Sequence, residues 1–421
     1  MTNKLKGNMM NGLDTFWILI CAFLVFFMQA GFGMVEAGLV RTKNAGNVLM
    51  KNVIDFSFAV LGYFIFGYAI MYGSDGALVG TSGWFMFGVE SPIEGVPVEA
   101  FWLFQAVFAG AAATIVAGAV AERMKFMAYL FYSFIITAFI YPVVGHWVWG
   151  GGWLSQLGFH DFAGSTVVHA LGGVSALVAA IMLKPRYGRF NKDGTPNVIA
   201  GHNMPLVAMG VFILWFGWYG FNAGSTLGFG DPELVARISL NTTLSPAVAA
   251  FAAMVISWIK YGKPDLSLAL NGVLGGLVGI TAPCAVVGSG SAILIGLIAG
   301  TLVVFSIEWM NKLKIDDVVG AFPVHGICGI FGTLAVGIFG SEALGSPQDG
   351  LLMGGGFGQL GIQSLGLVAC LSFTAVSMWI VFKVIDSTIG LRVSHKTELK
   401  GLDIEEHGME SYSGFQIFTT E

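Results

Sequence analysis

The sequence has little charge and no concentrated patch of basic residues. Only 11% of its 421 residues are Asp, Glu, Lys or Arg, against about 25% in ordinary soluble domains. So little charge leaves too little polar surface to cover a water-soluble globule. The 20 Lys and Arg residues are scattered between apolar runs, so we expect no nucleic-acid partner.

Cysteine is also scarce. The four cysteines show no paired spacing and all lie in apolar runs: Cys21, Cys284, Cys328 and Cys370. We therefore expect four small buried side chains rather than disulfides. No cleavable signal peptide is convincing, because the first apolar run continues too long, and we interpret it as a membrane span.

Long apolar runs are the main feature of the sequence. The chain is 55% hydrophobic with a mean hydropathy of +0.77, and about 20 mostly apolar residues cross a bilayer core. Lipid-embedded backbone must satisfy its own hydrogen bonds, so we predict an all-α polytopic membrane protein. It has eleven expected transmembrane helices, the seventh the shortest, at 16–38, 53–73, 101–121, 126–147, 163–183, 203–224, 244–260, 268–286, 290–310, 318–340 and 358–386.

Basic residues predict the topology. If the N-terminus is outside, only Lys4, Lys6 and Arg237 of the 20 Lys and Arg residues lie on the external side. The positive-inside rule therefore predicts an N-out, C-in orientation.

A short pattern occurs twice. It reads "DFAGSTVVHALGG" at 161–173 and "DVVGAFPVHGICG" at 317–329, with Asp, Gly, Val, His and Gly at matching places. The copies fall in the fifth and tenth spans, and an odd separation makes them run in opposite directions. We predict an inverted 5+5 repeat, about 16–183 and 203–340, followed by an appended eleventh helix at about 358–386.

Each copy of the pattern places one histidine in an apolar span. A lone buried histidine is usually a hydrogen-bonded core residue, but ionisable groups inside membranes tend to mark ion or proton paths. We expect His169 and His325 to line such a path. A metal site using Cys328 is a weaker alternative, because two His and one Cys without a carboxylate form a thin ligand set.

Aromatic and hydroxyl residues gather at three helix ends on the expected external side. They are Phe108, Trp149, Phe221 and Ser225, several of them beside glycines. An interfacial aromatic belt is the simpler explanation. However, aromatic faces attract a desolvating cation and a Ser oxygen accepts a hydrogen bond from it, so a small hydrogen-bonding cation would fit here.

These motifs resemble the ammonium transporter (Amt/Mep/Rh) family over nearly the whole chain. The resemblance is carried by "GLVRTKN", "AER", "WVWGGG", "DFAG", "VVH", "GFNAGS", "VHG" and "GLRVS…GLDIEEHG". It implies an eleven-span bundle that assembles as a homotrimer with one pore in each protomer.

The resemblance also implies roles for single residues. Phe108, Trp149 and Ser225 match an external recruitment site for ammonium, with Asp161 and Trp218 beside it. Phe108 and Phe221 match a stacked phenylalanine gate, and His169 and His325 match twin histidines lining the pore. Asp161 and Asp317 can also serve as helix N-caps.

We therefore expect ammonium or ammonia transport in a bacterial cytoplasmic membrane, without enzymatic activity, cofactor or metal. The alternative is an ammonium sensor, because "HGMESYSGFQIFTTE" at 407–421 weakly resembles the junction to a fused kinase or cyclase. A channel for another neutral gas is a third, weaker reading. We expect an external segment at 1–15, a membrane domain at 16–386 and a cytoplasmic tail at 387–421, which in the family contacts P-II signal proteins.

Overall fold

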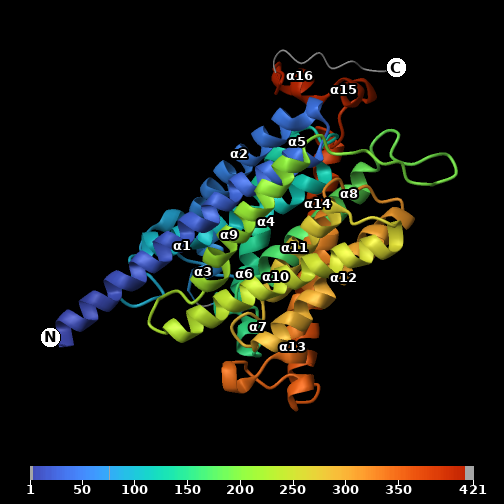
Figure 1. Cartoon of the computed structure of the whole chain (residues 1–421). Coiled ribbons are helices and arrows are strands. Elements are labelled where there is room, and N and C mark those ends of the chain that lie inside the picture. The colour runs from blue at the N-terminus through green and yellow to red at the C-terminus, as the bar shows by residue number, and fades with distance from the viewer. Residues whose placement is uncertain (1–2, 75, 413–421) are drawn as a thin grey trace.

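The computed structural model describes residues 3–74 and 76–412, and only the backbone of residues 3–10. Part of the tail on which the sensor hypothesis depends, 413–421, lies outside the described residues. Within them the protein is all-helical, and no strand forms. Figure 1 shows the helices packed into one bundle, with α15 and α16 at one end and α7 at the other. We call the end with α15 and α16 the tail face and the other end the far face.

Eleven apolar segments build the bundle. Ten helices in the described part of the chain are long and apolar enough to span a membrane. The first six are α1 (Asn3–Leu39); α2 (Ala45–Gly62), η2 (Tyr63–Gly67) and α3 (Tyr68–Tyr72); α4 (Val98–Val120); α5 (Phe126–Ile135), η4 (Ile136–Ile140) and α6 (Tyr141–Val148); η5 (Ser165–Ala170) and α8 (Leu171–Leu183); and α9 (Met204–Gly224). The remaining five are α10 (Pro232–Tyr261), α11 (Leu266–Thr281), α12 (Ser289–Lys312), η6 (Phe322–Ile327) with α13 (Cys328–Phe339), and α14 (Gly358–Thr388).

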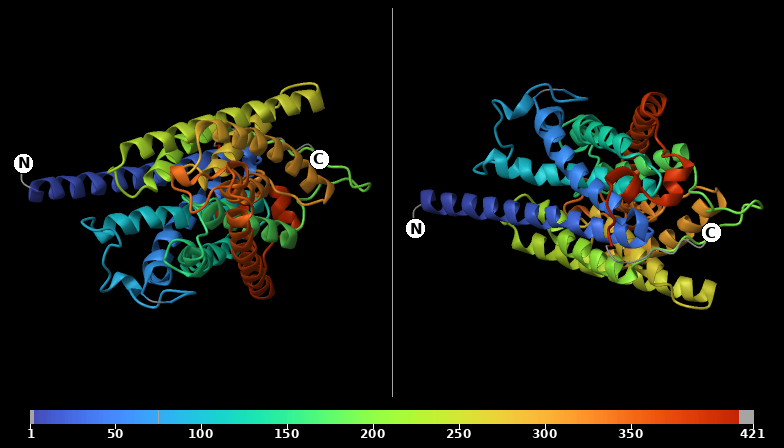
Figure 2. Two further views of the ribbon diagram at one scale, coloured as in Figure 1. Left: turned by 90° about the horizontal axis from the view of Figure 1, so that it is seen from below. Right: turned by 90° about the horizontal axis from the view of Figure 1, so that it is seen from above.

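Short helices connect or follow these segments. They are η1 (Thr42–Asn44), η3 (Trp84–Met86), α7 (Trp153–Gln156), η7 (Glu342–Leu344), η8 (Leu351–Met353), α15 (His395–Lys400) and α16 (Leu402–His407). Helix α1 lies along α9, and α10 packs on both α11 and α12. Figure 2 shows the bundle from below and from above, and α1 runs lengthwise beside α9 in both views. All four cysteines are free and buried, as expected.

One expected span was wrong in length. The seventh was expected at 244–260, but α10 begins at Pro232 and has 30 residues. Its first half carries polar residues that lower the hydropathy, and some of their hydrogen bonds are made inside the bundle: Asn241 Nδ2 donates to the carbonyls of Cys284 and Val287. The short segment is instead the eighth, α11, with 16 residues.

The two copies of the repeated pattern adopt the same local structure. Asp161 accepts hydrogen bonds from the backbone N–H groups of residues 164–167, and Asp317 accepts them from residues 320–322. Both carboxylates thus bind N–H groups at the start of the helix, but they do so from outside the N-cap positions, which Gly164 and Ala321 occupy. Each of these turns leads into a π-helical segment, η5 or η6. Such segments widen a helix locally and are frequent at functional sites.

Close backbone contact joins the two copies symmetrically. A Cβ added to Gly173 would lie 2.2 Å from the amide nitrogen of Gly326, and one added to Gly329 would lie 2.9 Å from that of Ala170. Residue 173 corresponds to 329 and residue 170 to 326, so the two contacts exchange under a twofold operation. Reciprocal contacts of this kind are the mark of twofold symmetry.

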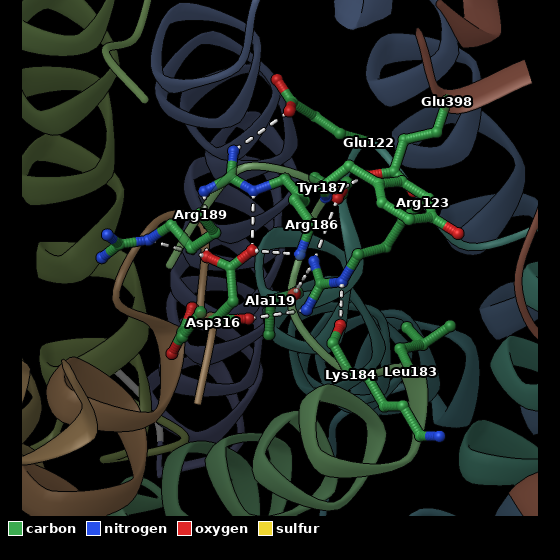
Figure 3. A network of polar contacts seen from close by, with 12 residues as sticks. Ala119, Glu122, Arg123, Leu183, Lys184, Arg186, Tyr187, Arg189, Asp316 and Glu398 are labelled. Carbon is green, nitrogen blue, oxygen red and sulfur yellow. Dashed lines mark hydrogen bonds and ion pairs between the residues drawn. The ribbon is translucent and has the colours of Figure 1, made fainter. Parts of the chain in front are cut away.

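A buried ionic network closes the tail face (Figure 3). The Arg186 guanidinium pairs with Asp316 at 2.8 Å and with Glu122 at 3.0 Å. Glu122 also binds Arg41. Burial alone would raise the pKa of Glu122, but the charges of Arg186 and Arg41 and the hydrogen bonds from Arg41 outweigh it and lower that pKa to about 2.

The tail is attached beside this network. Glu398 of α15 accepts a hydrogen bond from the backbone N–H of Tyr187 and pairs with Arg392 at 2.7 Å. In α16, Asp403 accepts hydrogen bonds from the backbone N–H groups of Gly46 and Asn47 at the start of α2. The tail is therefore bonded to the loops between spans as well as to the end of α14.

Candidate functional site

A cavity opens on the far face, where α4 begins and α6 and α9 end. It has a volume of about 510 Å³. Phe108, Trp149 and Ser225, predicted to act together, all line it. The other lining residues are Tyr72, Pro92, Ile93, Phe101, Phe104, Gln105, Val148, Gly150, Phe162 and Leu227.

Two polar side chains of this cavity already donate hydrogen bonds to backbone carbonyls. The Trp149 indole donates to the Asp161 carbonyl at 2.7 Å, which fixes its ring in the wall. The Ser225 hydroxyl donates to the Phe221 carbonyl at 2.8 Å. Its oxygen lone pairs remain able to accept a hydrogen bond from a ligand. The cavity therefore combines aromatic faces with a hydroxyl acceptor.

Two stacked phenylalanines form the floor of the cavity. The ring centroids of Phe108 and Phe221 lie 4.0 Å apart at an interplanar angle of 23°. Both side chains are buried, and Phe221 also lies 5.3 Å from the His169 ring. The pair therefore separates the open cavity from the histidines beneath it, and nothing hydrated can pass without moving a ring.

The two histidines meet in the middle of the bundle. Nδ1 of His169 lies 3.1 Å from Nδ1 of His325, and the rings are nearly parallel. Both residues are buried, and Nε2 of His169 has no hydrogen-bond partner among the described residues. Trp218 stacks on His169, with the ring centroids 5.0 Å apart.

Two further hollows continue the line toward the tail face. The first, of about 20 Å³, is lined by His325 and by Phe32, Glu36, Asn271 and eight apolar or glycine positions. The second is an open pocket of about 320 Å³ at the tail face, and Asn271 and Gly320 belong to the walls of both. Cavity, phenylalanine pair, histidine pair and hollows thus follow one another between the far face and the tail face.

Two predicted residues of the recruitment site lie outside the large cavity. Both oxygens of the Asp161 carboxylate are engaged by the backbone N–H groups of the η5 turn. The Trp218 indole is buried and donates to the Thr281 hydroxyl at 2.9 Å. In this arrangement Asp161 shapes the helix that carries His169, and Trp218 supports the His169 ring.

Sequence reasoning missed two polar residues of the path. Gln105 lines the large cavity, and its Oε1 atom has no partner among the described residues. It precedes Phe108 by three positions on α4, so helical spacing could have indicated it. Glu36 lines the small hollow, and a carboxylate in an apolar span was itself a signal.

The metal alternative has no support in the described part of the chain. No three His, Cys, Asp or Glu side chains there lie close enough together to hold a metal ion. Cys328, the third ligand considered, is directed at the Ala299 carbonyl, 3.6 Å away.

Similarity to known proteins extends over the whole membrane region. The model of the Ammonium Transporter Family matches residues 16–412. The chain is 46% identical to ammonium transporter Amt2 of Archaeoglobus fulgidus, with 99% of this chain and 92% of that protein covered. It is 47% identical to the putative ammonium transporter sll1017 of Synechocystis, with 96% and 90% covered.

Solved structures of similar proteins have the same fold. One described as a sensor Amt protein superposes with a TM-score of 0.90 at 37% identity, covering 95% of this chain and all of that one. Saccharomyces cerevisiae Mep2 gives a TM-score of 0.83 at 25% identity, with 91% and 87% covered. Sequence, fold and the arrangement of the path together show that this multi-pass membrane protein belongs to the ammonium transporter family.

Proposed function

We infer that the protein transports ammonium across a membrane. The observation that carries this conclusion is the single path through the protomer. An aromatic cavity, the stacked pair Phe108 and Phe221, and the bonded pair His169 and His325 follow one another along it. The relatives named above as ammonium transporters support the same substrate.

Recruitment takes place in the far-face cavity. A partly dehydrated ammonium ion is attracted by the ring faces of Trp149 and Phe108 and donates a hydrogen bond to Ser225. Gln105 offers a second acceptor, because its Oε1 atom has no partner in the described chain. Asp161 and Trp218 act indirectly, through the η5 turn and through the His169 ring.

Selectivity follows from the apolar interior. Moving a bare cation into low dielectric costs on the order of 20 kcal/mol in the idealised limit. Ammonium avoids most of this cost by releasing a proton near the phenylalanine pair, whereas potassium has no proton to release. Neutral ammonia then passes His169 and His325, and the proton follows along the imidazole pair.

The orientation, location and partners are part of the proposal. The tail face carries most of the basic residues and faces the cytoplasm under the positive-inside rule. The 1–15 segment then begins outside, the 16–386 domain spans a bacterial cytoplasmic membrane, and the tail from 387 lies inside. Family resemblance supports a homotrimer and a P-II signal protein as the partner of the tail.

An ammonium sensor is the second candidate. It is favoured by the fit to the structure described as a sensor Amt protein. A sensor needs the same recruitment cavity but no flux, so binding and current separate the two functions.

Purified protein in liposomes tests the proposal. An ammonium pulse on a supported proteoliposome layer should evoke a transient current, and isothermal titration should report binding of ammonium. A potassium pulse at equal concentration is the control and should evoke none. Binding without current would contradict transport and leave the sensor.

A further inference from the structure

The small hollow beneath His325 contains a buried acid that the steps above do not use. Glu36 lies on α1 one turn beyond Phe32, whose ring centroid is 6.1 Å from that of His325. Positions i and i+4 share one face of a helix, so Glu36 continues the same wall toward the tail face. Glu36 is only 2% exposed.

The hollow has the size of a single small molecule. Its volume is about 20 Å³, and about 10–15 Å³ of such space suffices for one water. Ammonia is close to water in size. Glu36 and His325 both belong to its wall, so one ammonia molecule leaving the histidine pair arrives beside a carboxyl group.

One oxygen of the Glu36 carboxyl accepts a hydrogen bond, and the other accepts none among the described residues. Asn52 Nδ2 donates to Oε2 of Glu36 at 2.8 Å. Oε1 lies against the backbone of α4, where a Cβ added to Gly118 would be 3.5 Å away. The Val319 side chain lies closer to that position, at 2.3 Å, so Oε1 lies between apolar groups and no described hydrogen bond is made to it.

The charges around Glu36 favour one bound proton. The charged groups that act on it are Asp55 and Lys51 of α2, both buried; Glu406 and Arg123, which act on Lys51, have opposite charges that offset each other. Asp55 accepts a hydrogen bond from the Tyr129 hydroxyl at 2.5 Å, and Lys51 donates to the Met124 carbonyl at 3.0 Å. Two carboxylates and one ammonium leave an uncompensated negative charge in a dry region, which is costly; a proton on one carboxyl cancels it.

We propose that Glu36 is the acid that returns the proton to ammonia at the tail end of the path, an inference that rests on the proposed ammonium transport. The O–H bond of the protonated carboxyl breaks, and its proton forms a new N–H bond with the ammonia lone pair. The products are ammonium and the Glu36 carboxylate. Ammonium leaves past Asn271 into the open pocket, and the carboxylate takes up the proton delivered through His169 and His325.

Glu36→Gln tests the proposal, with Glu308→Gln as the control. The first change removes the acid from the hollow and keeps an amide oxygen for Asn52. The second removes an acid that pairs with Lys260 at 2.8 Å and does not line the hollow. In proteoliposomes, we expect the ammonium-evoked current of Glu36→Gln to fall at least about tenfold, as for loss of a positioned acid. Glu308→Gln should stay within about twofold of the wild type.

Each other outcome overturns the assignment. An unchanged current in Glu36→Gln shows that the acid is not needed, while transport itself stands. Equal losses in Glu36→Gln and Glu308→Gln show a general effect of removing an acid and not a role of Glu36. A wild-type chain without any ammonium current overturns ammonium transport first, and the assignment with it.

If the Glu36→Gln variant does not fold, a spectroscopic measurement on the wild type tests the proposal instead. Ammonium-induced infrared difference spectra of the wild type should show loss of a carboxylic C=O band as Glu36 gives up its proton. Glu36→Asp keeps an acid at this position but changes its surroundings, so the band should shift in frequency. A band that is unchanged in Glu36→Asp belongs to another group and overturns the proposal.

Discussion

Nδ1 of His169 lies 3.1 Å from Nδ1 of His325. A hydrogen bond between two imidazole nitrogens requires one of them to donate and the other to accept. The two rings therefore hold one proton between their Nδ1 atoms, and the outer Nε2 atoms have unequal roles. A proton entering at one Nε2 reverses both roles, so the pair can pass on a proton without either residue moving far.

Replacing His325 by Leu should interrupt this pair. The residue keeps a similar volume but removes the partner of His169 Nδ1, so we expect the ammonium-evoked current to fall at least about tenfold. His395→Gln, in the exposed part of the tail, is the control and should keep the current. Unchanged flux and current in His325→Leu would show that the histidine role is wrong.

Replacing Phe108 by Ala should remove the barrier between the large cavity and His169. Its ring stacks on Phe221 at 4.0 Å, and its loss admits water and hydrated ions to the path. We expect the variant to admit potassium, measured as a potassium current in proteoliposomes. Phe104→Ala is the comparison, because Phe104 lines the cavity 4.8 Å from Phe108 but is not stacked on Phe221; equal potassium currents in both variants would refute a specific gate.

Replacing Gly173 by Ala should destabilise the contact between the two repeats. The added Cβ meets the amide nitrogen of Gly326 at 2.2 Å, and backbone atoms cannot give way as a side-chain end can. We expect a loss of about 1–3 kcal/mol, seen as a lower unfolding temperature in detergent.

Gly361→Ala is the matched control for this change. Gly361 lies in α14 with no atom within 4 Å of an added Cβ. There an alanine should be neutral or stabilise the helix by about 0.5–1 kcal/mol. If both variants unfold at the same temperature, the close approach of the repeats contributes no measurable stability.

The ionic network at the tail face should make stability depend on acid pH. The folded-state pKa of Glu122 is about 2, below its ordinary value of 4.5. A depressed pKa stabilises the fold above the unfolded-state value, and this contribution is lost as pH falls from about 4.5 toward 2. The shift corresponds to an upper value on the order of 3 kcal/mol.

Glu122→Gln should flatten this part of the pH profile. Unfolding midpoints between pH 7 and pH 2 measure the effect, and Glu405→Gln, at an exposed pair with Lys400, should leave the profile nearly unchanged. The idea fails if Glu122→Gln and the wild type lose stability in parallel as the pH falls.

The sequence alone determined the class of fold and much of the path. Low charge and long continuous apolar runs indicate a helical bundle in a membrane, because a helix satisfies its backbone hydrogen bonds within one segment. The repeated Asp-Gly-Val-His-Gly pattern at an odd span separation indicated inverted halves, and local rules indicated that Asp161 and Asp317 bind N–H groups near the start of a helix, although neither occupies the N-cap position. These features depend on composition and short-range spacing, which one sequence displays directly.

Only the tertiary structure decided which distant groups meet. The true length of α10 depends on carbonyls of residues 284 and 287 that bind Asn241, and hydropathy takes no account of such partners. Glu36 is near neither histidine in the chain, yet α1 brings it into the wall of the same hollow as His325. The cost of a buried polar group is set by what surrounds it in space, and packing of helices far apart in the chain decides those surroundings.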